Sequence, residues 1–294
     1  MMPEHFAEHR NLRIAGTIVL YQPDQDVISN IKSYFDEIEV LYVIDNSETM
    51  KSDIVQQILQ FDKIVYLPNG ENLGIATALN IAAVRAITDG YDFLLTMDQD
   101  SCAESGMINN LLRLLNYVVW DEIGIVSPVH VVESNPQSSN NGFFSEVKSV
   151  MTSGNLLNLK AYTKVGRFAD DLFVDCVDHD YCLRLTQAGF KIFQVNKSVL
   201  HHKLGLISQF KLLHKTLTTS NHSPLRRYYN TRNRFYIWNT YGDYAKEFVM
   251  EDKCSFRGEI RNILFGESER FAKFCMMIRG YLDYRNNKFG KYER

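Results

Sequence analysis

The sequence predicts an α/β fold built around a mainly parallel sheet. From residue 13 to residue 202, short apolar runs typical of buried strands alternate with segments whose apolar residues recur at helical spacing. The chain of 294 residues, 45% hydrophobic and 23% charged, is also long enough for one large domain with an appendage.

The N-terminal third of the chain is expected to contain four strands and three helices in alternation. Predicted strands cover 13–21, 39–47, 63–69 and 91–98, and predicted helices cover 27–38, 52–61 and 74–90. In a parallel sheet the loops that follow the strands lie at one edge, where ligands bind. The polar loops at 21–23, 45–47, 69–74 and 98–100 are therefore predicted to form one site.

The same pattern continues after residue 105. Predicted helices cover 107–119, 159–166 and 178–190, predicted strands cover 123–132 and 191–202, and a strand and turn are predicted within 147–159. Residues 133–146 are expected to form a mobile polar loop. From about residue 206 the pattern becomes helical, aromatic and basic. Two domains are expected, a main body at 1–205 and a helical C-terminal region at 206–294.

Charge is divided unevenly along the chain. Residues 1–205 contain 15 Lys and Arg against 26 Asp and Glu, a balance of −11, whereas residues 206–294 contain 17 against 9, a balance of +8. This asymmetry indicates an acidic body and a tail that meets an anionic partner, although a basic solvated surface explains it equally well. Five cysteines without a CxxC pair predict a reducing compartment, and no signal peptide or membrane span is recognisable.

Two aspartates, Asp98 and Asp100, stand one residue apart directly after an apolar run. Alternate side chains of a strand share a face, so the two carboxylates are expected to point the same way. Like charges held together are unfavourable unless a cation lies between them, and Mg²⁺ or Mn²⁺ takes oxygen ligands. A D-x-D pattern alone is more often a solvated loop or helix cap, but its position after a buried strand favours a metal site.

The loop from Asn69 to Gly74 opens a predicted helix. Backbone N–H groups there can bind the ribose or phosphate of a nucleotide, and a simple glycine turn is the alternative. The chain has no GxGxxG or GxxxxGK[ST] motif, which removes the main support for dinucleotide or Walker-type binding.

A second acidic group contains Asp175, Asp178 and Asp180. Near the start of a predicted helix, Asp178 is favoured by the helix dipole and is a candidate general base; a helix cap with a solvated turn is the alternative. The pair His201 and His202 ends a predicted strand, where a histidine can complete a metal shell or contact a phosphate.

Arginines and tyrosines gather in the segment RRYYNTRN. Guanidinium groups bind phosphate through two hydrogen bonds, and tyrosines stack on sugars or bases. Arg226 and Arg232 are therefore candidate donor-binding residues. A basic helix that covers the edge of the sheet is the alternative.

Taken in order, these motifs resemble those of family 2 glycosyltransferases, and most closely the bacterial rhamnosyltransferase branch that builds O-antigens and related polysaccharides. The segments that carry the resemblance are IVLYQPD, VIDNSE, NGENLGIATALN, LLTMDQDS, LFVDCVDHDYCLRLTQAGF, HHKLG and SPLRRYYNTRNRFYI. The resemblance spans residues 13–240. It implies a GT-A fold, with a Rossmann-like nucleotide-binding half and an acceptor half around one mixed, mainly parallel sheet.

The resemblance also implies roles for individual residues. Donor-nucleotide positions are Tyr21, Pro23, Asp45, Asn72 and, through the loop described above, Gly74. By the same resemblance, Asp98 approaches the ribose and the metal, Asp100 ligates Mg²⁺ or Mn²⁺, and His202 contacts the metal or the diphosphate. The general base is Asp178, but Val177 replaces the glutamate of the family motif, which leaves Asp175 as an alternative.

The function implied by the resemblance is inverting, metal-dependent transfer of L-rhamnose from dTDP-L-rhamnose to a polyprenyl-diphosphate-linked glycan at the inner face of the cell membrane. Residues 259–282 place apolar side chains at near-helical spacing with interleaved arginines, which suits an amphipathic helix on that membrane. A helix that forms a homodimer or packs into the core is the alternative.

Three other functions are weighed against this one. A sugar-nucleotide pyrophosphorylase would need a glycine-rich loop after the first strand, which the chain lacks. A donor-binding subunit would bind nucleotide without turnover. A nucleic-acid binder would use the basic tail, but the acidic body disfavours it.

Overall fold

The computed structural model describes residues 12–131, 142–202, 208–212 and 215–293. By its packing the chain divides into two compact units. The first, which we call the sheet unit, comprises Met1–Phe168 and Arg184–Lys203. The second, the helix unit, comprises Ala169–Leu183 and Leu204–Arg294. The short segment Ala169–Leu183 therefore packs with the C-terminal region.

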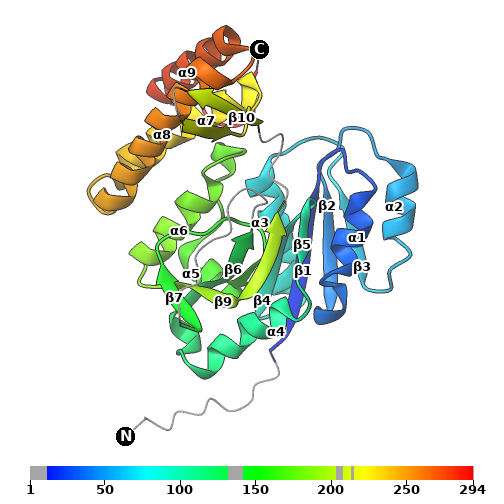
Figure 1. Ribbon diagram of the computed structural model, residues 1–294. Coiled ribbons are helices and arrows are strands. Elements are labelled where there is room, and N and C mark those ends of the chain that lie inside the picture. The colour runs from blue at the N-terminus through cyan, green and yellow to red at the C-terminus, as the bar shows by residue number, and fades with distance from the viewer. Residues whose placement is uncertain (1–11, 132–141, 203–207, 213–214, 294) are drawn as a thin grey trace, which may run out of the picture. The chain divides into compact units, whose positions relative to one another are not determined.

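The sheet unit is built on one nine-stranded sheet (Figure 1). Its strands are β1 (Ile14–Leu20), β2 (Val40–Asp45), β3 (Ile64–Pro68), β4 (Phe93–Asp98), β5 (Ser101–Ala103), β6 (Ile123–Val131), β7 (Phe144–Val147), β8 (Asn155–Asn158) and β9 (Lys191–His202). They follow the order β3-β2-β1-β4-β8-β6-β9-β5, and β7 also pairs with β9. The strands β3, β2, β1 and β4 are parallel, whereas β8 runs antiparallel to both its neighbours. The predicted mixed, mainly parallel α/β sheet is confirmed.

Helices pack on the sheet because its central strands are buried on both faces. These helices are α1 (Asp26–Lys32), α2 (Ser52–Ile58), α3 (Ile75–Thr88), α4 (Met107–Leu112) and α5 (Leu159–Val165), and α6 (Val177–Gln187) begins in the helix unit and ends in the sheet unit. Every residue of β1 is buried. Buried apolar residues of α1, α2 and α4 form a core cluster with alternate residues of β1.

Two predictions about local structure in the sheet unit need correction. The helix predicted over 27–38 ends at Lys32, and a 3₁₀ turn, Phe35–Glu37, follows it. The loop predicted over 133–146 lies outside the described residues up to 141, but its last residues belong to β7. The strand forms because it pairs with β9 and packs Phe144 edge-on against Phe193, at 5.6 Å between ring centroids.

The helix unit contains a hairpin and three long helices. The hairpin joins β10 (Ser208–Leu212) to β11 (Lys215–Thr219), and the helices are α7 (Pro224–Tyr241), α8 (Lys246–Gly266) and α9 (Arg270–Arg285). The predicted helical C-terminal region is confirmed, and a short hairpin that was not predicted precedes its helices. In α9, Gly280 permits close packing on α7, because a Cβ there would lie 2.5 Å from the backbone oxygen of Tyr228.

The single helix predicted over 259–282 is also wrong, because the chain breaks between α8 and α9. The break places Glu267 in the interior, where its carboxylate accepts hydrogen bonds from Arg227 at 2.6 Å and Lys273 at 2.8 Å. The chain then turns at Glu269, whose φ is +49°. Two buried cations thus share one buried carboxylate at the break between the two helices.

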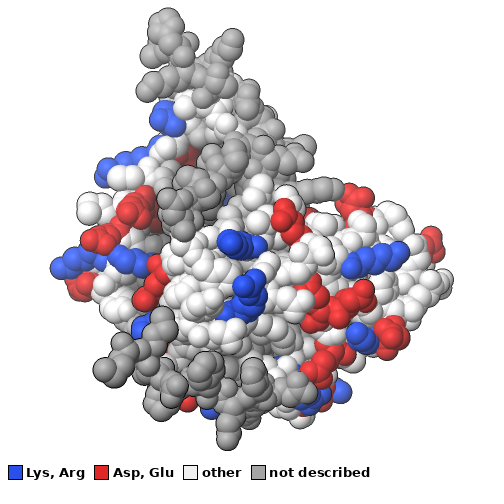
Figure 2. Space-filling model, turned by 60° about the horizontal axis from the view of Figure 1, so that its bottom comes forward, with Lys and Arg blue, Asp and Glu red and all other residues white. Residues whose placement is uncertain are grey.

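The uneven charge of the sequence is only partly a surface property. Arg227, Arg232, Arg234 and Lys273 are buried, so part of the basic excess of the C-terminal region lies inside the helix unit. On the face that Figure 2 shows, basic and acidic side chains occur in small groups separated by uncharged areas.

Candidate active site

The loops that follow β1, β2, β3 and β4 are joined by hydrogen bonds at one edge of the sheet. The side chain of Gln99 accepts from the N–H of Tyr21 at 2.8 Å and donates to its carbonyl at 3.1 Å. The N–H of Gln22 donates to Ser47 Oγ at 2.9 Å, and Asn69 donates to the side chain of Asn46 at 2.7 Å. The prediction that these loops lie together is confirmed.

Three potential metal ligands converge at this edge. One ligand atom from each of Asp98, Asp100 and His202 lies within 4.8 Å of the other two. The strand β4 ends at Asp98, and a turn then carries Asp100 to the start of β5. The antiparallel register between β5 and β9 places Ser101 opposite His202, which brings the histidine to the two aspartates. We call Asp98, Asp100 and His202 the cation cluster.

The chemistry of the cation cluster fits a hard divalent cation. Two carboxylates and one imidazole are ligands that Mn²⁺ accepts, and Mg²⁺ binds through one or two carboxylates together with substrate phosphates. His202 Nδ1 lies 3.5 Å from Asp100 Oδ1, and the two side chains are 13% and 46% exposed. The carboxylate of Asp100 is half-exposed, so a substrate could reach a cation bound to it from solvent. The imidazole of His202 is mostly buried, so it would hold the cation from the protein side.

A layer of buried polar side chains lies behind the cation cluster. The hydroxyl of Ser101 lies 2.7 Å from His202 Nδ1 and receives a hydrogen bond from Ser153 at 2.9 Å. Ser153 Oγ in turn accepts the backbone N–H of Asp98 at 3.0 Å. The sequence analysis did not single out Ser101 or Ser153.

The predicted donor-nucleotide residues lie on the same edge, but several already have protein partners. Asp45 is buried, and its two oxygens accept from Tyr66 at 2.7 Å and from the N–H of Ser47 at 2.9 Å. Asn72 folds back to accept the N–H of Gly74 at 3.0 Å. Two other predicted donor residues differ in exposure, since Tyr21 is exposed and Pro23 is buried.

The neighbouring His201 points to a different partner from His202. Its Nε2 lies 2.9 Å from the carboxylate of Glu104, and both side chains are about half exposed. Of the histidine pair, only His202 joins the cation cluster.

The acidic group at the start of α6 belongs to the helix unit, and its three aspartates have different environments. Asp180 is fully buried and accepts from Tyr241 at 2.7 Å. Asp175 is paired with Arg226, which donates to one of its oxygens at 3.1 and 3.2 Å. Asp178 is half-buried, at the second position of α6, and one of its oxygens accepts the N–H of His179 at 2.8 Å. Within the described residues, no hydrogen-bond partner is found for its other oxygen.

The segment that leads into α6 has an unusual backbone. Three non-glycine residues, Phe173, Asp175 and Cys176, have φ near +60°. At Phe173 (φ +64°, ψ −64°) the chain makes a γ-turn of the rare, strained type, closed by a hydrogen bond of 2.7 Å from Val174 N–H to the Leu172 carbonyl. Backbone strain of this kind concentrates at functional sites, which supports a role for the aspartates beside it.

Two residues of α7 hold this segment. The amide nitrogen of Asn233 lies 2.8–2.9 Å from the carbonyl oxygens of Leu172, Val174 and Asp175. The guanidinium of Arg232 is 1% exposed and donates to the carbonyls of Asp171, Leu172 and Gly290. The predicted donor-binding residue Arg232 is thus engaged in the interior of the helix unit, whereas Arg226 is half-exposed beside Asp175.

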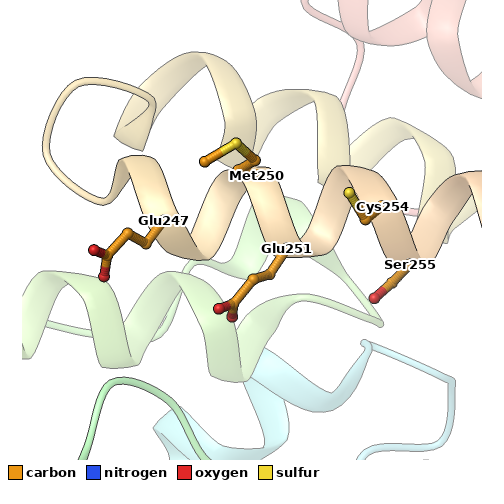
Figure 3. A pocket seen from close by; sticks show the side chains of 5 residues that line it. All are labelled: Glu247, Met250, Glu251, Cys254 and Ser255. Atoms are coloured by element: carbon orange, nitrogen blue, oxygen red, sulfur yellow. The ribbon is translucent and has the colours of Figure 1, made fainter.

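A shallow hollow lies along α8 and is lined by Glu247, Met250, Glu251, Cys254 and Ser255 (Figure 3). The two carboxylates point to the same side of the helix in this view. All five residues come from a single helix, and none of the predicted site residues lines the hollow.

Comparison with solved structures defines the fold class as that of GT-A glycosyltransferases. A crystal structure of GalNAc-T7 with UDP, GalNAc and Mn²⁺ matches 95% of this chain with a TM-score of 0.60 at 11% identity. This chain spans 57% of that protein. Residues 1–349 of TarS from S. aureus match 96% of this chain and 93% of their own length, with a TM-score of 0.52 and 11% identity.

The sequence comparisons agree with the predicted family. Residues 25–140 match the model of Glycosyl transferase family 2, the family that the sequence motifs resemble. A curated relative, dTDP-rhamnosyl transferase RfbF from Shigella flexneri, is 25% identical over 248 residues, which cover 77% of this chain and 80% of the relative.

Proposed function

We propose that this protein is an inverting, cation-dependent glycosyltransferase that transfers L-rhamnose from dTDP-L-rhamnose to a lipid-linked glycan acceptor during synthesis of a bacterial surface polysaccharide. The observation on which this proposal depends is the cation cluster, which joins Asp98, Asp100 and His202 at the loop edge of a family 2 glycosyltransferase. A divalent cation held there would offset the negative charge of a departing nucleoside diphosphate.

In this proposal Asp178 is the general base. Of the three aspartates near α6, Asp180 accepts hydrogen bonds from tyrosines and Asp175 is paired with Arg226. Asp178 keeps one carboxylate oxygen without a described partner, and it stands in the first turn of α6. Its carboxylate takes the proton of the acceptor hydroxyl as that oxygen attacks the anomeric carbon. A single displacement inverts this carbon.

The choice of donor is supported by the relative rather than by a sugar contact. The Shigella flexneri relative is named a dTDP-rhamnosyl transferase, and the loops around Tyr21, Asp45 and Asn72 lie at the edge where donor nucleotides bind in this fold class.

Thermal unfolding with Mn²⁺ and a panel of nucleotide sugars tests the donor. Ligand at 100 times its Kd stabilises the folded state by about 2.7 kcal/mol. We expect dTDP-L-rhamnose to raise Tm more than UDP-glucose or GDP-mannose does. A larger shift with either of the other two donors would contradict the assignment of the sugar while leaving the family unchanged.

A peripheral membrane location is part of the proposal and is supported by α9. Phe271, Cys275, Ile278 and Leu282 form an exposed apolar stripe at helical spacing, and Phe271 is 84% exposed. The exposed charged residues of α9 are all arginines, because its aspartate and its lysine are buried. An apolar stripe flanked by arginines suits an anionic lipid surface at the inner face of the cell membrane better than a second copy of the same basic face.

Within the described residues, no helix is long and apolar enough to cross a membrane.

A further inference from the structure

We propose that Ser101 and Ser153 form a positioning pair that fixes the His202 ring for the divalent cation and couples it to the backbone of Asp98. This inference rests on the proposed function, because the cation belongs to that function. It adds two residues that touch neither the cation nor the substrate.

The two serines form a continuous chain of hydrogen bonds between members of the cation cluster. The N–H of Asp98 donates to Ser153 Oγ at 3.0 Å, and Ser153 Oγ donates to Ser101 Oγ at 2.9 Å. Ser101 Oγ then meets His202 Nδ1 at 2.7 Å. The chain starts at the end of β4 and finishes at the end of β9, so it links two ligands that are 104 positions apart in the sequence.

Burial makes this chain more than a surface contact. Ser101 is fully buried and Ser153 is 2% exposed. A buried hydroxyl without a hydrogen-bond partner is unfavourable, whereas alanine would fill almost the same space without needing a partner. The two buried hydroxyls satisfy each other through their hydrogen bond, and Ser101 also bonds to the histidine of the cation cluster.

A serine hydroxyl suits the second ring nitrogen of a histidine ligand. Ser101 Oγ has one proton and two lone pairs, so it bonds to Nδ1 and still accepts the hydrogen bond from Ser153. A partner on one ring nitrogen fixes the direction in which the other nitrogen faces, as histidine ligands require.

The backbone around Ser153 is itself fixed. Gly154 has φ +82°, and a Cβ there would lie 2.8 Å from Pro128 Cγ and 2.9 Å from Leu200 Cδ2, so glycine is required. The carbonyl of Ser153 lies 2.7 Å from Nε2 of the buried His130. The backbone of Ser153 is thus fixed by the tight turn at Gly154 and by the contact with His130. A fixed backbone is expected of a residue that positions Ser101 and His202.

The test measures Mn²⁺ affinity from the electron paramagnetic resonance signal of free Mn²⁺, without any sugar donor. We expect Ser101→Ala and Ser153→Ala to weaken Mn²⁺ binding about 10- to 100-fold, the range found for residues that orient metal ligands. The matched control is Ser198→Ala. Ser198 is also buried, on β9 like His202, but its hydroxyl donates to the carbonyl of Met107 at 2.9 Å. This control should bind Mn²⁺ as the wild type does.

A second step separates positioning from general loss of structure. In a His202→Ala background, the additional change Ser101→Ala should weaken Mn²⁺ binding no further, because the serine acts through the ring. An equal further loss would overturn the inference. Unchanged affinity in both single serine variants, with Mn²⁺ bound by the wild type, would overturn the inference alone. A wild type that fails to bind Mn²⁺ would overturn both the inference and the proposed function.

Discussion

Removing the side-chain amide of Asn233 should destabilise the helix unit far more than an ordinary asparagine substitution does. In Asn233→Ala the carbonyls of Val174 and Asp175 lose their donor, whereas the carbonyl of Leu172 keeps Arg232 and the N–H of Val174. A fully buried carbonyl without a partner costs about 1–3 kcal/mol, and these two carbonyls are half-buried, so each should cost an amount at the lower end of this range. We expect a loss of about 2 kcal/mol in the free energy of unfolding.

Urea unfolding followed by the fluorescence of Trp238 measures this loss in the helix unit. The chain has two tryptophans, so a Trp120→Phe background leaves Trp238 on α7 as the reporter. The control is Asn262→Ala, which removes one exposed amide–carbonyl hydrogen bond of 3.2 Å to Thr218 and should cost less than about 0.5 kcal/mol. Equal losses in the two variants would refute the conclusion that Asn233 holds the left-handed segment before α6.

Three further predictions concern charge and surface. Burial and the charges of Arg226 and Arg227 lower the pKa of His222 from 6.5 to about 4, so stability should be full above pH 6.5 and fall as pH drops toward 4. At pH 5 the free energy of unfolding should be lower by about 1 kcal/mol, after allowance for solvent screening. In His222→Asn the free energy of unfolding should not show this decrease between pH 6.5 and pH 5. Glu267→Gln should lower the free energy of unfolding, measured by chemical denaturation, by about 3–5 kcal/mol, because it leaves buried cations uncompensated. A decrease below about 1 kcal/mol would contradict this prediction. When both Phe271 and Ile278 are changed to glutamate, the amount of protein that co-sediments with anionic vesicles should fall at least about tenfold. Unchanged binding to the vesicles would contradict the membrane contact. So would light scattering that shows a dimer for the wild type and a monomer for this variant.

The sequence predicts the sheet well because its strands are local and strongly apolar. The strand β9 has the predicted bounds, Lys191–His202, and β1 and β4 differ from the prediction by one or two residues at an end. In each case the apolar run coincides with the buried strand, so composition alone marks the element. The meeting of the polar loops then follows from parallel pairing.

The elements that escaped prediction depend on contacts between distant residues. The three-residue strand β5 has no pattern of its own and forms because it pairs with the end of β9. The hairpin β10–β11 is short and forms by antiparallel pairing of Ser208–Leu212 with Lys215–Thr219. The break after α8 depends on the buried carboxylate of Glu267, whose partner Arg227 is 40 residues away.

The cation cluster shows the same division. The spacing of Asp98 and Asp100 was visible in the sequence, but the approach of His202 required the register of β5 with β9. Ser101 and Ser153 lie 52 positions apart in the sequence, and only the folded protein joins them. At α6 the sequence left Asp178 and Asp175 as alternatives, and the ion pair between Asp175 and Arg226 now favours Asp178 in the proposed mechanism.

The most direct test of the proposed function is the hydrolysis of dTDP-L-rhamnose by the purified protein, measured as release of dTDP with Mn²⁺ and with EDTA, in the wild type and in Asp100→Asn. We predict release with Mn²⁺ and a loss of at least about 100-fold both in EDTA and in the variant, as expected when a group that stabilises developing charge is removed. Equal rates under all four conditions would contradict the assignment of Asp98, Asp100 and His202 as the cation site.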